Sequence, residues 1–315
     1  MTFSFATTNI LVIGDVMLDK YIIGNVNRIS PEAPVPIVNI YDNKTTLGGS
    51  ANVAYNLSCL GINSHLLGVI GNDQDSFEMV SLIKEKNISD LLFRSSQIST
   101  TVKTRIIAER QQLIRLDRES FFTENFDLLS HLQIFLNKAK FDVIIISDYN
   151  KGVCSTDICS YSIDYAKKKN LKIIIDPKGK DWEKYRGAYI VTPNLKELQD
   201  ISLTRIDNND VDVARVGKSI LNEYGFENLL VTRSERGMSL IEKGGLITHF
   251  HAKAHSIYDV SGAGDTVVAT LGAALSSGLE LKKSVEIANI AAGIVVGKLG
   301  TSPITLDELN DYLLI

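Results

Sequence analysis

The chain is poor in cysteine, and its three cysteines lack the spacing of a metal or redox motif. Cys59, Cys154 and Cys159 include no C-x-x-C pair, and one thiol is left over if two of them pair. This pattern argues against a disulfide framework and a cysteine zinc site, and it favours reduced thiols in a cytoplasmic setting. The five histidines show no H-x-x-x-H spacing, so we expect a structural role for each.

Positive charge and long apolar runs are also scarce. Lys and Arg number 33 against 37 Asp and Glu, which gives a net charge of −4 and no basic signature for nucleic acid or an anionic membrane surface. No apolar run approaches the ~20 residues of a membrane span, and residues 1–9 lack the features of a signal peptide. We therefore expect a cytoplasmic protein without a nucleic-acid or membrane partner, in which local lysines and arginines hold any anionic substrate.

Familiar nucleotide motifs are missing as well. Gly217-Lys218-Ser219 lacks the first glycine of a P-loop, because position 212 is Asp, and no Rossmann glycine triplet follows the first apolar run. The composition is nevertheless that of an ordinary globular protein, with 44% hydrophobic and 22% charged residues. A chain of 315 residues is long enough for one large α/β domain.

What the sequence does contain is a repeated alternation of apolar strands and helical stretches. Apolar runs at 10–13, 142–146, 172–175, 189–192 and 228–231 are separated by helical patterns, which predicts βαβ units and a parallel sheet. Polar residues follow several runs directly, so one binding crevice is expected along the carboxyl edge of the sheet. We expect a single domain over 1–315, with a further strand-like segment at 249–258.

Two β-rich insertions, at about 20–46 and 100–118, interrupt this alternation. Pro36 within the run 35–41 indicates an edge strand. Lys103 and Arg105 are two residues apart in the second insertion, so they share one face of a strand. We interpret the insertions as a small β-sheet lid that covers the active site with one face and pairs with a second subunit through the other. A solvated face is an equally good explanation for any one basic residue taken alone.

The segment Asp259-Val260-Ser261-Gly262-Ala263-Gly264-Asp265-Thr266 carries the chemistry. Small and apolar residues follow it, which predicts a buried helix whose N-terminus, opened by glycines, is an anion site. Asp265 lies within that anion site, where a carboxylate without a role would repel the ligand. The segment therefore suggests phosphoryl transfer with Asp265 as general base. The alternative is a helix cap after a flexible turn, because short glycine motifs often match by chance.

Three motifs in one order resemble the PfkB/ribokinase-like carbohydrate kinases. They are Gly48-Gly49 with Asn52, the stretch Thr192 to Glu197, and Asp259 to Asp265. The resemblance covers essentially the whole chain and implies a ribokinase-like three-layer α/β/α domain with a mostly parallel sheet and a small β-sheet lid.

Longer strings, such as Arg28-Ile29-Ser30-Pro31-Glu32-Ala33-Pro34-Val35-Pro36, resemble one subgroup of this family, the D-glycero-β-D-manno-heptose-7-phosphate kinases. Those enzymes phosphorylate the anomeric O1 in ADP-heptose synthesis for the lipopolysaccharide core. In many of them a nucleotidyltransferase domain follows the kinase. This chain stops at Ile315, so the resemblance implies a stand-alone kinase.

The resemblance also implies roles for individual residues. Asp265 would deprotonate the sugar hydroxyl, while the N–H groups of Gly262, Ala263 and Gly264 would stabilise the phosphoryl group that leaves ATP. The expected sugar ligands are Asp15, Asp19, Gly48, Gly49 and Asn52. The candidates for the 7-phosphate are Arg28, Lys103, Arg105 and Lys178. The expected nucleotide-site residues are Thr232, Gly237, Val260 and Asn289.

Asn194 and Glu197 match the family's N-x-x-E element, which acts on Mg²⁺ through waters. Arg233 departs from the family's T-x-G-x-x-G pattern, and the need for a monovalent cation stays open. Two alternatives also stay open: another PfkB-type sugar or sugar-phosphate kinase, and a non-catalytic sugar-binding protein on the same fold. The basic residues of the predicted lid favour a phosphorylated sugar over a nucleoside.

Overall fold

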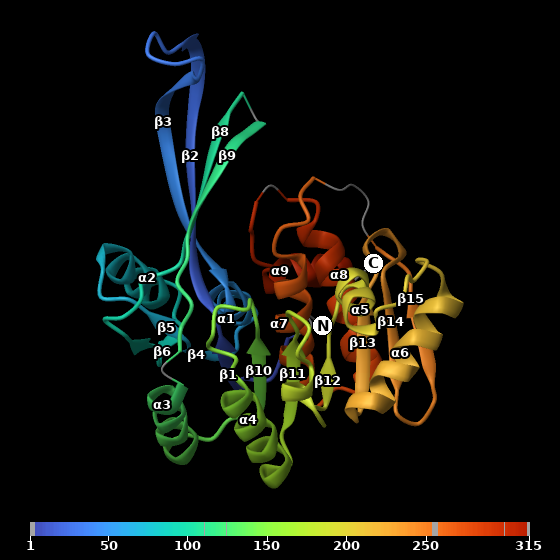
Figure 1. The fold of residues 1–315 in the computed structure, drawn as a ribbon. Helices are drawn as coiled ribbons and strands as arrows, with labels where there is room; N and C mark the ends of the chain where they lie inside the picture. The colour runs from blue at the N-terminus through green and yellow to red at the C-terminus, as the bar shows by residue number, and fades with distance from the viewer. Residues whose placement is uncertain (1–3, 110, 124, 254–257, 299, 314–315) are drawn as a thin grey trace.

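The computed structural model describes residues 4–109, 111–123, 125–253, 258–298 and 300–313. Its centre is a nine-stranded sheet with the order β15-β14-β13-β12-β11-β10-β1-β4-β6 (Figure 1). The strands are β1 (Asn9–Gly14), β4 (Asn63–Leu67), β6 (Ser89–Asp90), β10 (Val143–Ser147), β11 (Lys172–Asp176), β12 (Ile190–Val191), β13 (Asn228–Thr232), β14 (Met238–Glu242) and β15 (Ile247–Phe250). The pairs from β6 to β13 are parallel, and β14 and β15 add an antiparallel edge, which confirms the mostly parallel sheet.

Helices cover both faces of this sheet. One face carries α1 (Ser50–Cys59), α2 (Gln74–Glu85), α7 (Ala263–Ser276), α8 (Leu281–Val295) and α9 (Leu306–Leu313). The other carries α3 (Asn125–Lys138), α4 (Thr156–Lys169), α5 (Leu195–Ser202) and α6 (Asp210–Tyr224). In β1, Ile10 and Val12 enter the first core and Leu11 and Ile13 the second, because side chains alternate along a strand. A strand buried on both faces is therefore a continuous apolar run, and the predicted three-layer arrangement is confirmed.

A second, four-stranded sheet projects from this body (Figure 1). Its strands are β2 (Val16–Ile29), β3 (Pro36–Gly49), β8 (Val102–Ala108) and β9 (Gln111–Arg118), and we call it the lid. β2 pairs with β3 antiparallel and with β8 in parallel, so the two insertions form one sheet, as expected. Pro36 opens the edge strand β3. β2 and β3 reach further toward the body than the predicted insertion, to residues 16 and 49.

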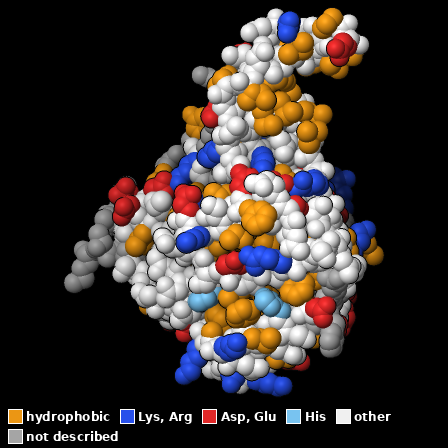
Figure 2. Space-filling view, turned by 90° about the vertical axis from the view of Figure 1, so that its left-hand side faces the viewer, with side chains coloured by type: hydrophobic (Ala, Val, Ile, Leu, Met, Phe, Trp, Pro, Cys, Tyr) orange, Lys and Arg blue, Asp and Glu red, His pale blue; other side chains and the backbone are white. Residues whose placement is uncertain are grey.

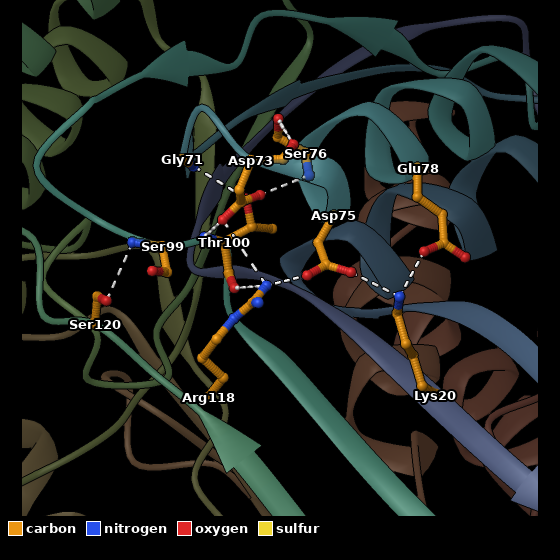
Figure 3. Close-up of polar contacts among 10 residues, drawn as sticks. All are labelled: Lys20, Gly71, Asp73, Asp75, Ser76, Glu78, Ser99, Thr100, Arg118 and Ser120. Atoms are coloured by element: carbon orange, nitrogen blue, oxygen red, sulfur yellow. Dashed lines mark hydrogen bonds and ion pairs between the residues drawn. The ribbon is translucent and has the colours of Figure 1, made fainter.

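The base of the lid is tied to α2 by a cluster of ion pairs (Figure 3). Lys20 Nζ on β2 lies 2.6 Å from Asp75 Oδ1 and 2.6 Å from Glu78 Oε2. Arg118, the last residue of β9, contacts the other oxygen of Asp75. Asp73 caps α2, and its second oxygen accepts a hydrogen bond from the backbone just before β8. Two lid strands thus share one carboxylate of α2, which fixes the lid relative to the sheet.

Some boundaries differ from the expectation. The segment predicted as a strand at 249–258 holds a strand only to Phe250, and residues 254–257 lie outside the described part of the chain. β14 was not predicted. It folds back on β13 after the 3-10 turn Ser234–Arg236. Two shorter features are the pairing of β5 (Val69–Ile70) with β7 (Phe93–Arg94) and the 3-10 turn Glu183–Tyr185. No helix among the described residues is long and apolar enough to cross a membrane.

Candidate functional site

The candidate site lies where the carboxyl ends of β1 and β10 meet the first turn of α7. Asp15 follows β1, Tyr149 follows β10 by two residues, and Asp265 lies in the first turn of α7. Hydrogen bonds join Tyr149 to both of these carboxylates. The parallel sheet thus brings together polar groups that are far apart in the sequence, at the edge where such sheets bind ligands.

The N-terminus of α7 keeps the geometry of an anion site. Gly262 precedes the helix with φ +79°, and a Cβ at this position would lie 2.7 Å from Thr301 Cγ2 and 3.1 Å from Asn52 Nδ2. Only glycine fits such a place. The first N–H groups of a helix have no acceptor within it. Here the Ala263 N–H donates to the Val260 carbonyl over 3.3 Å, and no side chain of the described residues caps the helix. The N–H groups of Gly264 and Asp265, together with the partial positive charge of the helix N-terminus, are the groups that suit an anion.

Asp265 is a buried carboxylate with a donor on each oxygen. Asn52 Nδ2 donates to Oδ2 over 2.7 Å, and the Tyr149 hydroxyl donates to Oδ1 over 2.6 Å. Burial raises the pKa of Asp265 to about 6, the two hydrogen bonds lower it, and the charge of Asp19 raises it further. A carboxyl group with a pKa near neutrality is suited to take a proton at physiological pH.

Asn52 is itself held in place by Asn56, one turn later on α1. Asn56 Nδ2 donates to the Asn52 carbonyl over 2.9 Å. The Thr266 hydroxyl and the Ile304 backbone N–H both donate to Asn56 Oδ1, over 3.2 and 3.0 Å. Sequence reasoning missed Asn56. Its signal is an Asn pair at i, i+4 among the small and apolar residues of α1, where each buried amide needs a partner.

Asp15 supports the loop that follows β10. Its carboxylate accepts three backbone N–H bonds, from Tyr149 over 2.8 Å, Lys151 over 3.0 Å and Val153 over 3.1 Å. Burial raises the pKa of Asp15 to about 6, the charge of Asp148 adds to this, and the three backbone bonds lower it. We predicted Asp15 as a sugar ligand, but the partners that the structure gives its carboxylate all belong to this loop.

Asp19 lies at the base of the lid beside a glycine that makes room for it. A Cβ on Gly48 would collide with Asp19 Oδ2, and Gly49 directly precedes α1. Asp19 is buried and forms an ion pair with Arg105, whose guanidinium lies 5.4 Å from the centre of the Tyr21 ring. The structure therefore places Asp19, Gly48, Gly49 and Asn52 around the start of α1, close to Asp265.

The four predicted phosphate ligands do not lie together. In the lid, Asp19 is in register with Lys103 and Tyr21 with Arg105, so Lys103 and Arg105 share the face of Asp19. Lys103 Nζ lies 2.7 Å from Glu119 Oε1 and 3.3 Å from Asp117 Oδ2. Lys178 is on another part of the sheet edge, 2.8 Å from Glu197. Arg28 is exposed near the tip of the lid.

The strand itself separates Arg28 from the other cations. Arg28 is nine residues beyond Asp19 on β2, which is roughly 30 Å at about 3.3 Å per residue. Within one chain, only Lys103 and Arg105 among the four candidates lie beside Asp19.

The N-x-x-E element forms a capping box at the start of α5. Asn194 Oδ1 accepts from the Glu197 N–H over 2.9 Å, and Glu197 Oε2 accepts from the Asn194 N–H over 3.0 Å. Nearby Asp176 ends β11. Burial and the charges of Glu197 and Asp265 raise the pKa of Asp176 well above its usual value. This surplus of negative charge, carried by oxygen ligands, fits a divalent cation such as Mg²⁺.

Three of the four predicted nucleotide residues, Thr232, Gly237 and Asn289, lie on the side of β13 to β15. Thr232 ends β13 and donates its N–H to the Pro193 carbonyl over 2.9 Å, and Gly237 packs against the backbone of Phe250. Asn289 on α8 is buried and donates to the carbonyl of His251 over 2.7 Å. Val260 is exposed in the turn before α7.

Arg233, which departs from the family pattern, points into the protein. Its Nη1 lies 2.6 Å from Asp210 Oδ1 and 2.8 Å from Ser239 Oγ, and the side chain is buried. Its observed contacts therefore hold the end of β13 to α6 and β14.

Comparison with known proteins agrees with this geometry. Residues 7–308 match the pfkB family of carbohydrate kinases. The chain belongs to this family. It is 43% identical over 307 residues to the bifunctional protein HldE of Paramagnetospirillum magneticum, an alignment that covers 96% of the chain and 62% of that relative. The chain thus spans less than two thirds of the length of this bifunctional relative. As a pfkB family member it is a carbohydrate kinase, which transfers a phosphoryl group to a hydroxyl group.

Solved structures show the same fold. The phosphofructokinase-2 of Escherichia coli in complex with potassium superposes with a TM-score of 0.80 at 18% identity, and covers 98% of this chain and 100% of that one. The ribokinase of Thermotoga maritima gives a TM-score of 0.74 at 21% identity, and the match again covers 98% of this chain and 100% of that one. The predicted ribokinase-like fold is confirmed.

In this pfkB kinase, Tyr149 is the main residue that sequence reasoning left without a role. It stands in a polar loop directly after a buried strand, the position from which the other candidate residues were chosen. A tyrosine in such a loop offers both a hydroxyl and a large apolar ring. The position and type of this residue could have marked it as a site residue, and the structure shows its hydroxyl bonded to Asp265.

Proposed function

We propose that the protein transfers the γ-phosphoryl group of ATP to the anomeric hydroxyl O1 of D-glycero-β-D-manno-heptose 7-phosphate. The observation that carries the proposal is the buried Asp265 carboxylate in the first turn of α7, where a base and an anion site share one turn of helix. The heptose phosphate as acceptor is supported by the sequence strings described above and by the 43% identity with HldE.

Asp265 takes the proton from the attacking hydroxyl in this proposal. Its pKa of about 6 leaves the carboxylate mostly ionised at pH 7 to 8, while its burial keeps competing water away. The N–H groups of residues 262 to 265 donate to the oxygens of the transferring phosphoryl group, where negative charge accumulates.

Asp19 and Arg105 are proposed to hold the sugar and its distal phosphate. Asp19 accepts hydrogen bonds from sugar hydroxyls next to Asn52, and Arg105 with Lys103 supplies positive charge on the same face of the lid. Both cations are already paired with acidic side chains, so the pairs are rearranged when a phosphate binds. A guanidinium suits this task because it can bind two phosphate oxygens at once.

ATP brings Mg²⁺, which neutralises charge on its phosphates. Asn194 and Glu197 are proposed to hold the ion through waters, beside Asp176. Glu197 keeps its capping bond through one oxygen, and the other oxygen pairs with Lys178.

We further propose that two copies pair through their lids. Apolar side chains gather on the projecting lid (Figure 2), among them Ile29, Ile40, Tyr41 and Leu116, which are 61%, 60%, 66% and 52% exposed. An exposed apolar sheet surface of this kind marks an interface, and a two-fold axis would cover the same surface on both copies.

An ADP-release assay over a panel of sugars tests the substrate. Heptose 7-phosphate should be turned over fastest, with NMR locating the new phosphate on O1. Faster turnover of fructose 6-phosphate, ribose or a nucleoside would assign the enzyme to another kinase of the family. Absence of turnover with every sugar, while calorimetry still detects sugar binding, would point to a binding protein. Assays with K⁺ or Na⁺ as the only monovalent cation test the ion requirement.

A further inference from the structure

Tyr149 connects the two buried carboxylates of the site. Its backbone N–H donates to Asp15 Oδ2 over 2.8 Å, and its hydroxyl donates to Asp265 Oδ1 over 2.6 Å. We propose that Tyr149 is a positioning residue for phosphoryl transfer, which fixes the Asp265 carboxylate and favours its ionised form. The inference rests on the proposed role of Asp265 as the base.

The backbone of Tyr149 is held in place by the Asp15 carboxylate. Besides the bond from Tyr149, Asp15 accepts N–H bonds from Lys151 and Val153, so one buried carboxylate holds three residues of the loop. Asn150 adopts the left-handed conformation with φ 58°, and its N–H donates to Asp148 Oδ1 over 2.6 Å. Three backbone anchors on one carboxylate leave the loop little freedom, so the tyrosine ring starts from a defined position.

The loop is also fixed from the side of the lid. The Phe122 N–H donates to the Lys151 carbonyl over 2.8 Å, and Lys151 Nζ contacts Glu119 Oε2. Glu119 follows β9 directly and pairs through its other oxygen with Lys103 of the lid. The segment that leads out of the lid therefore packs against the loop that carries Tyr149.

The hydrogen bonds leave Asp265 open to a substrate. Each carboxylate oxygen can accept two hydrogen bonds. Asn52 takes one place on Oδ2 and Tyr149 takes one on Oδ1, so an acceptor hydroxyl can use a remaining place. Burial and the charge of Asp265 raise the pKa of Tyr149, so the phenol stays protonated and remains a donor. Donors to a carboxylate favour its charged form, which is the form that accepts a proton.

The substitution Tyr149→Phe tests this through the pH profile. The acidic limb of kcat/KM, measured with the best sugar substrate, should move up by about one pH unit, the effect of losing one hydrogen bond to a charged group. Activity should therefore fall more at pH 6 than at pH 8. Tyr165→Phe on α4 is the matched control, because the Tyr165 hydroxyl also donates one hydrogen bond, to the Leu136 carbonyl over 2.8 Å. An equal loss at every pH would reduce Tyr149 to a structural residue and overturn the inference.

A measurement without substrate separates this inference from the proposed function. Protein labelled with ¹³C at the aspartate carboxyl carbons is titrated by NMR, and the Asp265 signal is assigned by its absence in Asp265→Asn. Its midpoint should rise in Tyr149→Phe and stay unchanged in Tyr165→Phe. An unmoved midpoint refutes the inference even in an active enzyme. A raised midpoint in a protein that phosphorylates no sugar supports the Tyr149 contact and removes the proposed function.

Discussion

Replacing the proposed base should make the protein more stable as well as inactive. Asp265→Asn keeps the size of the side chain and removes its charge. The new amide can still accept from Asn52, and its NH₂ can donate to the Tyr149 hydroxyl oxygen, so neither neighbour is left without a partner. Transfer should fall at least ~10²-fold, the usual contribution of a general base.

The size of the stability gain follows from the pKa. Burial raises the pKa of Asp265 from 3.8 to about 6 in the folded protein. The folded pKa lies above the unfolded one, so the contribution of this group to stability is present in full below pH 3.8 and is lost as pH rises through about 6. At pH 8 the loss is about 3 kcal/mol, at about 1.4 kcal/mol per pKa unit, and at pH 5 it is about 1.5 kcal/mol. The variant, which cannot ionise there, avoids this loss.

Urea unfolding at pH 8 and pH 5 measures the effect. The free energy of unfolding of Asp265→Asn should exceed that of the wild type at both pH values, by about twice as much at pH 8. Asp164→Asn, a change at an exposed position on α4, should give no comparable gain. A variant that is less stable at pH 8, or whose gain is the same at both pH values, would refute the view that burial raises the pKa of Asp265 in the folded protein.

Three further predictions concern the surroundings of the base. Arg105→Ala should raise KM for the sugar phosphate about tenfold or more, and KM for ATP far less, because charged hydrogen bonds to phosphate are lost. Arg215→Ala on α6, which loses an ion pair with Asp212, is the control, and an unchanged sugar KM would remove Arg105 from the phosphate site. Glu197→Gln should raise the Mg²⁺ concentration needed for half-maximal rate at nearly unchanged stability, since a glutamine can still cap α5. An unaltered Mg²⁺ requirement would leave capping as its role. Ile40→Asp should convert a dimer to a monomer in light scattering at micromolar concentration, whereas Val211→Asp, also at an exposed apolar position, should not. A monomeric wild type would contradict the lid interface.

The fold could be predicted because its signals are local. Ile10 to Ile13 is an unbroken apolar run because both faces of β1 are buried. Gly262 and the small residues after Asp265 mark the start of α7, and a Cβ on Gly262 would collide with Thr301. Pro36 indicated an edge strand, and β3 is one. In each case a single stretch of sequence carries the physical cause.

Other features depend on partners that are distant in the sequence. Asp15 bonds to residues up to 138 positions away, so its carboxylate could not be assigned to the loop after β10 from the sequence. Asn194 and Glu197 fit a metal element and a capping box equally well, and the geometry shows the second directly. The distance of Arg28 from Asp19 depends on the length of β2 and on a register shift between Val26 and Arg28. Such facts require the tertiary structure.

The comparison of Asp15 with Asp265 shows why burial alone does not identify a candidate base. Burial raises the pKa of both carboxyl groups to about 6, so titration alone would not distinguish them. Their hydrogen-bond donors do. Asp15 is bonded to three backbone N–H groups of one loop, which tie it to the architecture. Asp265 receives its bonds from two side chains, Asn52 and Tyr149, and lies in the first turn of α7, which we propose binds the phosphoryl group. Tyr149 belongs to both sets, through its backbone and its hydroxyl, so in our proposal the Asp15 carboxylate fixes the residue that holds the proposed base.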